Sequence, residues 1–419
     1  MKNNKKLFIG LLFTLSTLLL FAEQKSELVS WKDAPSLKEA YNGKIDYIGV
    51  AVPHTAWPSE EKIYSSPSYQ EMIGRHFSSV TMENDAKPDS LLGTYYTGEP
   101  KLFEDFTDSF GNTIKVPKNK LRFITLDECL ATSKKLGIKM RGHVLVWHIS
   151  TPDWFFKKGY KSSENFVDKE TMTARQEWYI KSVLEHIKAW EDKNNNGNRI
   201  IYCWDVVNEA ASDIGTKIRD EGSNWYSIYK SDEFIINAFR FANKYAPKDV
   251  ALVYNDYNEW LQNKREMILK IIKTIQSHEN DDFLPTRIDA VGLQSHINMT
   301  KPLRTDYERI IKEFLKTGLD IHITELEIAS LTKSDAKNPK KLKKMYNDFY
   351  KLYLKYAKTE NKNGVESVTV WGINDNFTWL NFPANGQLQW LNNVFQYPLL
   401  FDENNNAKPA FYGVLEAAQ

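Results

Sequence analysis

The sequence predicts an α/β fold, because short β-branched runs alternate along its 419 residues with longer segments of helical period. The predicted strands are apolar along nearly their whole length, as in a parallel sheet that is covered on both faces. There are eight of them, at 45–52, 77–84, 139–147, 201–209, 250–257, 289–297, 320–328 and 367–375. Eight strand-then-helix units in one chain predict a closed (β/α)8 barrel, the TIM barrel architecture.

The predicted helices lie between these strands. The two clearest carry apolar stripes at helical spacing, formed by Ile180, Val183, Leu184 and Ile187 in one and by Ile268, Ile271, Ile272 and Ile275 in the other. A third begins with Asn338 as its N-cap and Pro339 in its first turn. A doubly wound open sheet is the structural alternative, but no glycine-rich phosphate loop follows the first strand. We therefore expect a single domain over residues 30–419.

The N-terminal stretch "MKNNKKLFIGLLFTLSTLLLFAEQ" predicts a secretory signal over residues 1–22. Lysines precede an apolar run, Leu7 to Ala22, that is too short to span a bilayer comfortably. We expect cleavage near Ala22, a secreted protein that is extracellular or periplasmic, and no stable membrane insertion after cleavage.

Charge and cysteine content limit the possible partners and cross-links. With 55 basic and 54 acidic side chains the formal net charge is +1, which argues against nucleic acid or an anionic membrane as the main partner. The two cysteines, Cys129 and Cys203, are compatible with a disulfide or with two buried thiols. We favour separate thiols, because one falls on a helical segment and the other inside a strand.

Polar and aromatic side chains end most of the predicted strands. One polar strand end is ordinarily a capping or solvated residue. In a parallel barrel, however, all strand C-termini open onto one face, where functional groups gather. The residues expected at that face are Glu83, Asn84, His143, His148, Asn208, Glu209, Asn255, Gln294, His296, Glu325, Glu327, Trp371 and Trp379.

Glu209 and Glu325 end the fourth and seventh predicted strands, which can aim both carboxylates at one point. Two carboxylates in different environments can act as acid and nucleophile, the requirement for cleaving a glycosidic bond with retention. A metal site is the alternative, but the histidines at these strand ends show no metal-ligand spacing. We therefore expect neither a metal nor an organic cofactor.

The neighbouring side chains suit a neutral sugar polymer. Amides can donate to and accept from hydroxyl groups at once, and such amides are Asn84, Asn208, Asn255 and Gln294. The indoles of Trp147, Trp371 and Trp379 suit either the walls of a sugar site or the core.

Eight motifs follow one another along nearly the whole mature chain: "TMENDAKPDS", "RGHVLVWHISTPDWF", "WDVVNEA", "YNDYN", "GLQSHI", "HITELEI", "VTVWGINDNFTW" and "PLLFDENNNAKPAF". In this order they resemble the glycoside hydrolase family 10 endo-β-1,4-xylanases, and "WDVVNEA" with a downstream "ITELE" is the most specific part. The resemblance implies a catalytic (β/α)8 domain that cleaves internal β-1,4 bonds of xylan or xylo-oligosaccharides by double displacement. We expect it to act as a monomer.

The resemblance also implies residue roles. Glu209 would be the general acid/base and Glu325 the nucleophile, while Asn208 would hydrogen-bond the 2-hydroxyl of the sugar under attack. The other expected substrate-binding residues are Glu83, Asn84, Lys87, His143, Trp147, Asn255, Gln294, His296, Trp371 and Trp379. His296 would also hold the nucleophile in place, and Asp205, His148 and Glu327 would support the site from behind.

Several positions depart from the family pattern. Ser150 stands for the usual Gln and removes a long donor from the non-reducing side, and Glu327 stands for the usual Asp next to His296. Ala86 and Pro88 stand for Met and Trp. The segments 92–120 and 381–397 are longer than the family versions, and we expect them to extend or narrow the cleft.

Two alternative functions remain open at this point. One is a related barrel glycosidase acting on β-glucan or mannan, since an Asn-Glu strand end and a later Glu recur across such barrels. The other is a non-catalytic polysaccharide-binding barrel, against which the presence of both glutamates argues.

Overall fold

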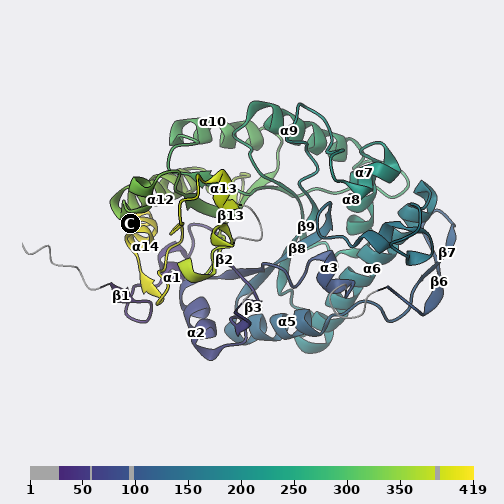
Figure 1. Cartoon of the computed structure of the whole chain (residues 1–419), viewed down its shortest axis with the longest axis horizontal. Helices are drawn as coiled ribbons and strands as arrows, with labels where there is room; N and C mark the ends of the chain where they lie inside the picture. Colours follow the sequence, from purple (N-terminus) through teal and green to yellow (C-terminus); the bar gives the residue numbers. More distant parts are fainter. Residues whose placement is uncertain (1–27, 57–58, 94–98, 383–386) are drawn as a thin grey trace, which may run out of the picture.

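The computed structural model describes residues 28–56, 59–93, 99–382 and 387–419 (Figure 1). The predicted signal at 1–22 lies outside the described residues. Within the described ranges, no helix is both long enough and apolar enough to cross a membrane.

Eight parallel strands form a closed barrel. Each pairs with the next along the chain, and the pairings of β11 with β13 and of β14 with β2 complete the ring. The strands are β2 (Tyr47–Val52), β5 (Ser79–Met82), β8 (Lys139–Trp147), β9 (Ile201–Asn208), β10 (Ala251–Asp256), β11 (Ala290–Leu293), β13 (Asp320–Ala329) and β14 (Val365–Val370). The predicted barrel is confirmed. The run at 289–297 also reaches β12 (His296–Asn298), which pairs with the end of β13.

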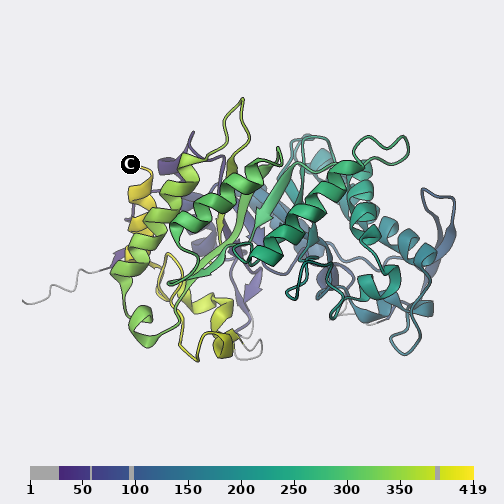
Figure 2. The same ribbon diagram turned by 90° about the horizontal axis from the view of Figure 1, so that it is seen from above.

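Helices cover the outside of the barrel (Figures 1 and 2). They are α1 (Leu37–Tyr41), α2 (Pro67–His76), α3 (Pro88–Leu91), α5 (Ile124–Leu136), α6 (Lys169–Asn194), α7 (Asn224–Tyr229), α8 (Glu233–Tyr245), α9 (Gln262–Ser277), α10 (Arg304–Leu315), α11 (Lys333–Ala336), α12 (Pro339–Lys355) and α14 (Pro409–Ala417). The short helix α13 (Gln387–Trp390) lies instead at one end of the barrel, inside this ring of helices (Figure 1). The three helices predicted in detail are α6, α9 and α12. Asn338 caps α12 as predicted, because its side chain accepts the backbone N–H of Lys341.

Short elements complete the fold. Two small antiparallel pairs join β1 (Val29–Ser30) to β15 (Asn406–Ala407) and β3 (Thr55–Ala56) to β4 (Glu61–Lys62). The 3-10 helices span Asp153–Phe156, Lys158–Tyr160, Asp375–Phe377 and Trp379–Asn381. Cys129, on α5, and Cys203, on β9, are both buried and free, so the preference for separate thiols is confirmed.

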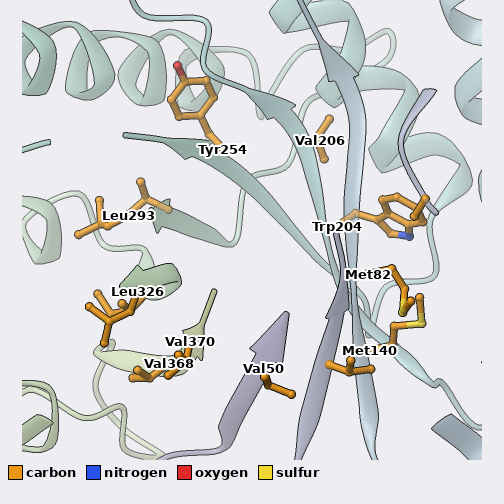
Figure 3. Packing of buried hydrophobic residues seen from close by; sticks show 14 of the residues in the cluster. Val50, Met82, Met140, Trp204, Val206, Tyr254, Leu293, Leu326, Val368 and Val370 are labelled. Atoms are coloured by element: carbon orange, nitrogen blue, oxygen red, sulfur yellow. The ribbon is translucent and has the colours of Figure 1, made fainter. Parts of the chain in front are cut away.

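The core fills the barrel and the layer between strands and helices (Figure 3). Side chains such as Val50, Leu293 and Leu326 are buried on barrel strands. The indole of Trp204, on β9, lies directly over Gly142, its partner on β8. A Cβ atom built at Gly142 would lie 2.2 Å from that ring, so the close approach of the two strands requires glycine there.

The long segment after β5 forms a hairpin on the outside of the molecule. Its strands, β6 (Phe103–Thr107) and β7 (Thr113–Pro117), pair antiparallel. The backbone N–H of Ser109, at the hairpin tip, donates to Glu177 of α6 at 2.8 Å, and Figure 1 places the hairpin at the edge of the molecule. No described residue of 92–120 lines the cleft at the carboxyl ends of the barrel strands. The expectation that this segment extends or narrows the cleft is therefore wrong for its described part.

Gly142→Ala is expected to destabilise the barrel, because the new methyl group would overlap the buried indole of Trp204. Overpacking of this kind costs about 1–3 kcal/mol, which chemical denaturation would measure as a loss in the free energy of unfolding.

Gly74→Ala on α2 is the matched control. Its Cβ would meet Leu136 at 3.4 Å, an ordinary contact, and alanine is favoured over glycine inside a helix by about 0.5–1 kcal/mol. Wild-type stability in the Gly142 variant would contradict the described packing of β8 on β9.

Candidate active site

A cleft of about 790 Å³ opens at the carboxyl ends of the barrel strands. The predicted site residues that line it are Glu83, Asn84, Lys87, His143, Trp147, Asn208, Glu209, Gln294, His296, Glu325, Glu327, Trp371 and Trp379. Side chains far apart in the sequence thus meet in one cavity. Asn255, Asp205 and His148 do not line it, and each lies behind a residue that does.

The backbone of Glu209 is turned so that its carboxyl group reaches the cleft. Adjacent strand residues point to opposite faces, so a regular strand would not present both Asn208 and Glu209 to one cavity. Glu209 instead adopts a left-handed conformation, with φ +57°. Its N–H donates to the Asn255 carbonyl and its carbonyl accepts from Arg219 Nε, both at 2.9 Å. These bonds help to offset a conformation that costs on the order of 1 kcal/mol.

Three neutral donors surround the Glu209 carboxyl group. Trp147 Nε1 donates to Oε2 at 2.9 Å, and Gln294 Nε2 donates to Oε1 at 3.0 Å. Asn208 Nδ2 lies 3.3 Å from the same Oε1. Neutral donors orient a carboxyl group without adding a charge next to it, which suits a group that must take up and release a proton.

A chain of amides joins the two glutamates. Asn255 Nδ2 donates to Asn208 Oδ1 and to Glu325 Oε1, each at 2.9 Å. Its Oδ1 accepts from the hydroxyl of Thr324 at 2.7 Å. Asn255 is fully buried and its polar atoms are engaged. The expectation that it contacts sugar is therefore wrong, and it holds Glu325 and Asn208 from below.

His296 lies between two carboxylates on β13. Its Nε2 is 3.2 Å from Glu325 Oε2, and its Nδ1 is 2.9 Å from Glu327 Oε1. Burial lowers the pKa of His296, but the two carboxylates outweigh burial and raise the pKa to about 10. The imidazole is therefore a cation at neutral pH.

The pKa values of the two carboxylates of β13 are shifted in opposite directions. Burial raises the pKa of Glu325, but hydrogen bonds from His296 and Asn255, with the nearby imidazole of His143, bring the net shift below its ordinary value. For Glu327 burial dominates over His296 and the pKa is raised. The contacts thus favour the ionised form of Glu325 more strongly than that of Glu327.

The substitution of Glu for Asp at position 327 preserves the contact with His296. The longer side chain also accepts from Trp379 Nε1, at 2.8 and 2.9 Å to its two oxygens. Glu327 therefore fixes the imidazole and one indole wall together. The other wall, Trp371, lies edge-on to the ring of His143, with the ring centres 5.6 Å apart.

Buried charges support His143 from beneath. Its Nδ1 lies 2.9 Å from Asp205 Oδ2, which also accepts from Arg141 Nε at 2.9 Å. Burial raises the pKa of Asp205, but the charges and hydrogen bonds of Arg141 and His143 together outweigh burial, and the net shift is downward. His322 Nδ1 contacts the same guanidinium at 2.7 Å. A carboxylate at Nδ1 leaves Nε2 of His143 as the atom free to meet a ligand.

The end of β5 supplies a second group of polar residues. Burial raises the pKa of Glu83 to about 8, although Lys87 opposes the shift. Lys87 Nζ lies 3.2 Å from Asn84 Oδ1 and 5.0 Å from the centre of the Trp147 ring. Pro88, where the family has Trp, begins α3.

Ser150 is buried and does not line the cleft, whereas its neighbour Ile149 lines it and is 65% exposed. The family pattern has a Gln at position 150, but here Ser150 contributes nothing to the cleft and the apolar Ile149 lines it instead.

His148 lies behind Glu209, next to Arg219 and Trp225 around a small cavity. Burial, followed by the charge of Arg219, lowers its pKa to about 4, so the ring is neutral at ordinary pH. This position agrees with a supporting role.

Several cleft residues were missed by the sequence analysis. Tyr257 and Trp260 follow β10, and Phe382, Trp390 and Leu391 come from the long segment after β14. Two sequence signals pointed to this group: Tyr257 belongs to the "YNDYN" motif, and Phe382, Trp390 and Leu391 fall in the long segment 381–397, which was expected to reach the cleft. Among the described residues, no group of three or more His, Cys, Asp or Glu side chains is arranged to hold a metal ion.

The model of glycosyl hydrolase family 10 matches residues 36–417. The chain belongs to this family. It is 30% identical over 391 residues to an endo-1,4-beta-xylanase of Geobacillus stearothermophilus, with 91% of this chain and 98% of that protein covered. It is 32% identical over 404 residues to endo-1,4-beta-xylanase A of Thermotoga maritima, covering 94% of this chain but only 32% of that longer protein.

A solved structure of a family 10 relative has the same fold. It is the N-terminal endo-1,4-beta-D-xylanase 10B of Clostridium thermocellum complexed with xylohexaose, with a TM-score of 0.72 and 28% identity. The match covers 94% of this chain and 69% of that one.

Glu327→Gln is expected to lower the pKa of His296 from about 10 toward 6.5, because one of its two carboxylate partners is removed. A raised histidine pKa stabilises the fold fully below pH 6.5 and loses that contribution as the pH rises through 10. The alkaline loss of stability should therefore begin at lower pH in the variant.

Titration of the imidazole signals by NMR measures this shift. His76, the last residue of α2, serves as an internal control, since burial lowers its pKa to about 4 and it has no contact with Glu327. An unchanged His296 titration would mean that Glu327 does not contact the ring.

Proposed function

We propose that the protein is a retaining endo-1,4-β-xylanase in which Glu209 is the acid/base and Glu325 the nucleophile. The observation that carries the proposal is the linkage of the two carboxyl groups in one cleft through Asn208, Asn255 and Gln294. Their different surroundings, neutral donors for one and a cationic imidazole for the other, match the two roles.

The proposed reaction has two displacements. Glu325 attacks the anomeric carbon while Glu209 gives its proton to the oxygen of the departing sugar, and the glycosidic C–O bond breaks. Water then attacks the anomeric carbon and passes a proton to Glu209, while the ester bond to Glu325 breaks and releases its carboxylate. Asn208 is held so that its amide can bind the 2-hydroxyl, and His143 offers Nε2 beside it.

Xylan is the proposed substrate for two reasons. The relatives matched over most of the chain are named endo-1,4-beta-xylanases. Glu83, Asn84 and Lys87 add a carboxyl, an amide and an ammonium group for sugar hydroxyls on one side of the centre. The formal net charge of +1 agrees with a neutral polymer. We also propose export by residues 1–22 and action as a monomer.

Purified protein should release reducing sugar from xylan much faster than from cellulose, mannan or mixed-linkage glucan, with internal cuts giving a mixture of oligomers. Product sizing distinguishes internal cleavage from release of single sugars. Preferred hydrolysis of glucan or mannan would favour the related-glycosidase alternative, and no hydrolysis of any of the four would favour a binding protein.

Glu325→Ala and Glu209→Ala should each lower kcat on xylan by at least about a hundredfold, with circular dichroism and thermal unfolding like wild type. On an aryl xylobioside, whose leaving group needs no proton, azide should accelerate Glu209→Ala and give the β-azide, because Glu325 still forms the intermediate.

The Glu325 variant lacks that intermediate, so azide can only attack directly and give the α-azide. Exchanged outcomes would reverse the assigned roles. Near wild-type turnover of xylan by either variant would refute the assignment.

A further inference from the structure

Trp390 is the only tryptophan in the described ranges that is largely exposed, with 74% of its surface accessible. Folded proteins bury most of each tryptophan, so an exposed indole in a cleft is unusual. Trp390 ends α13 and lines the cleft together with Leu391 and Phe382. The chain just after α13 is bonded to Leu331, two residues past β13, the strand that carries Glu325.

The segment that carries Trp390 is fixed to the end of β13. Gln396 is fully buried, and its Oε1 accepts from the Ser330 N–H at 2.7 Å while its Nε2 donates to the Ser330 carbonyl at 2.9 Å. Asn392 Nδ2 donates to the Leu331 carbonyl at 3.1 Å. Ser330 and Leu331 directly follow β13. The bonds to them therefore attach the residues just after Trp390 to the strand that carries Glu325, which limits how far the indole can move from the reacting centre.

Trp390 is chemically distinct from the wall residue Trp379. The Trp379 indole is half-buried and its Nε1 is committed to Glu327. Trp390 offers an open ring face with no comparable attachment among the contacts of the described residues. Pyranose rings present flat C–H faces that pack on such rings, while their hydroxyl groups stay in water.

We propose that Trp390 forms an outer sugar-binding position, on which one xylose ring of a long chain stacks while the bond to be cleaved lies between Glu209 and Glu325. The inference rests on the proposed function and specifies the substrate further as a chain long enough to span both places. The described part of the segment 381–397 then extends the cleft rather than narrowing it.

The test compares a long and a short substrate. Trp390→Ala should lower the ratio of kcat/KM on xylohexaose to kcat/KM on an aryl xylobioside by about tenfold, a loss typical of one aromatic contact. Trp390→Phe, which keeps a flat ring, should stay within about threefold of the wild-type ratio. Phe395→Ala is the matched control, since Phe395 is an exposed aromatic of the same segment, 55% accessible, that does not line the cleft.

The outcomes separate the two proposals. A wild type that cleaves neither xylohexaose nor the xylobioside refutes the proposed function. A wild type that cleaves both, with the same ratio in Trp390→Ala and Phe395→Ala, refutes the outer position alone. An equal fall in both alanine variants would also refute it, because the effect would then belong to the segment and not to the indole in the cleft.

Discussion

The side-chain amide of Asn255 is the contact on which the site depends. Its nitrogen donates to Asn208 and to Glu325, each at 2.9 Å, and its oxygen is satisfied by Thr324. One buried group thus joins the ends of β9, β10 and β13. A fully satisfied polar network of this kind specifies a single arrangement, since any shift leaves a buried donor or acceptor without a partner. The barrel is the scaffold that brings the three strand ends within reach of one amide.

Electrostatics then separates the two carboxyl groups. Glu325 shares β13 with Glu327, and the cation of His296 between them allows both to be buried side by side. Glu209 has only neutral donors at its oxygens. The charged partner favours the ionised form of Glu325, as the proposed role of nucleophile requires. These differences arise from the partners in direct contact with each carboxyl group and do not depend on the net charge of the chain, which is only +1.

The sequence predicted the barrel and most of the cleft for one physical reason, that parallel strands end on one face. It did not predict which buried side chains hold the cleft residues from beneath. Asn255 looked like a cleft residue, but the register shift between Val253 and Tyr254 sets it opposite Asn208 and beneath the cavity. Arg141 and His322 lie within apolar runs, and their roles depend on neighbours across the barrel that spacing along one chain does not reveal. The outward direction of the hairpin at 103–117 depends likewise on its packing to α6. The contact of Trp390 and Leu391 with the cleft depends on the attachment of Gln396 to Ser330.

The most direct test of the account is the anomeric configuration of the first product, followed by proton NMR during the opening minutes of xylohexaose hydrolysis. Two carboxyl groups acting as acid/base and nucleophile predict that the β-anomer appears first and that the α-anomer follows only at the rate of mutarotation. Initial appearance of the α-anomer would contradict the double displacement, and with it the division of roles between Glu209 and Glu325.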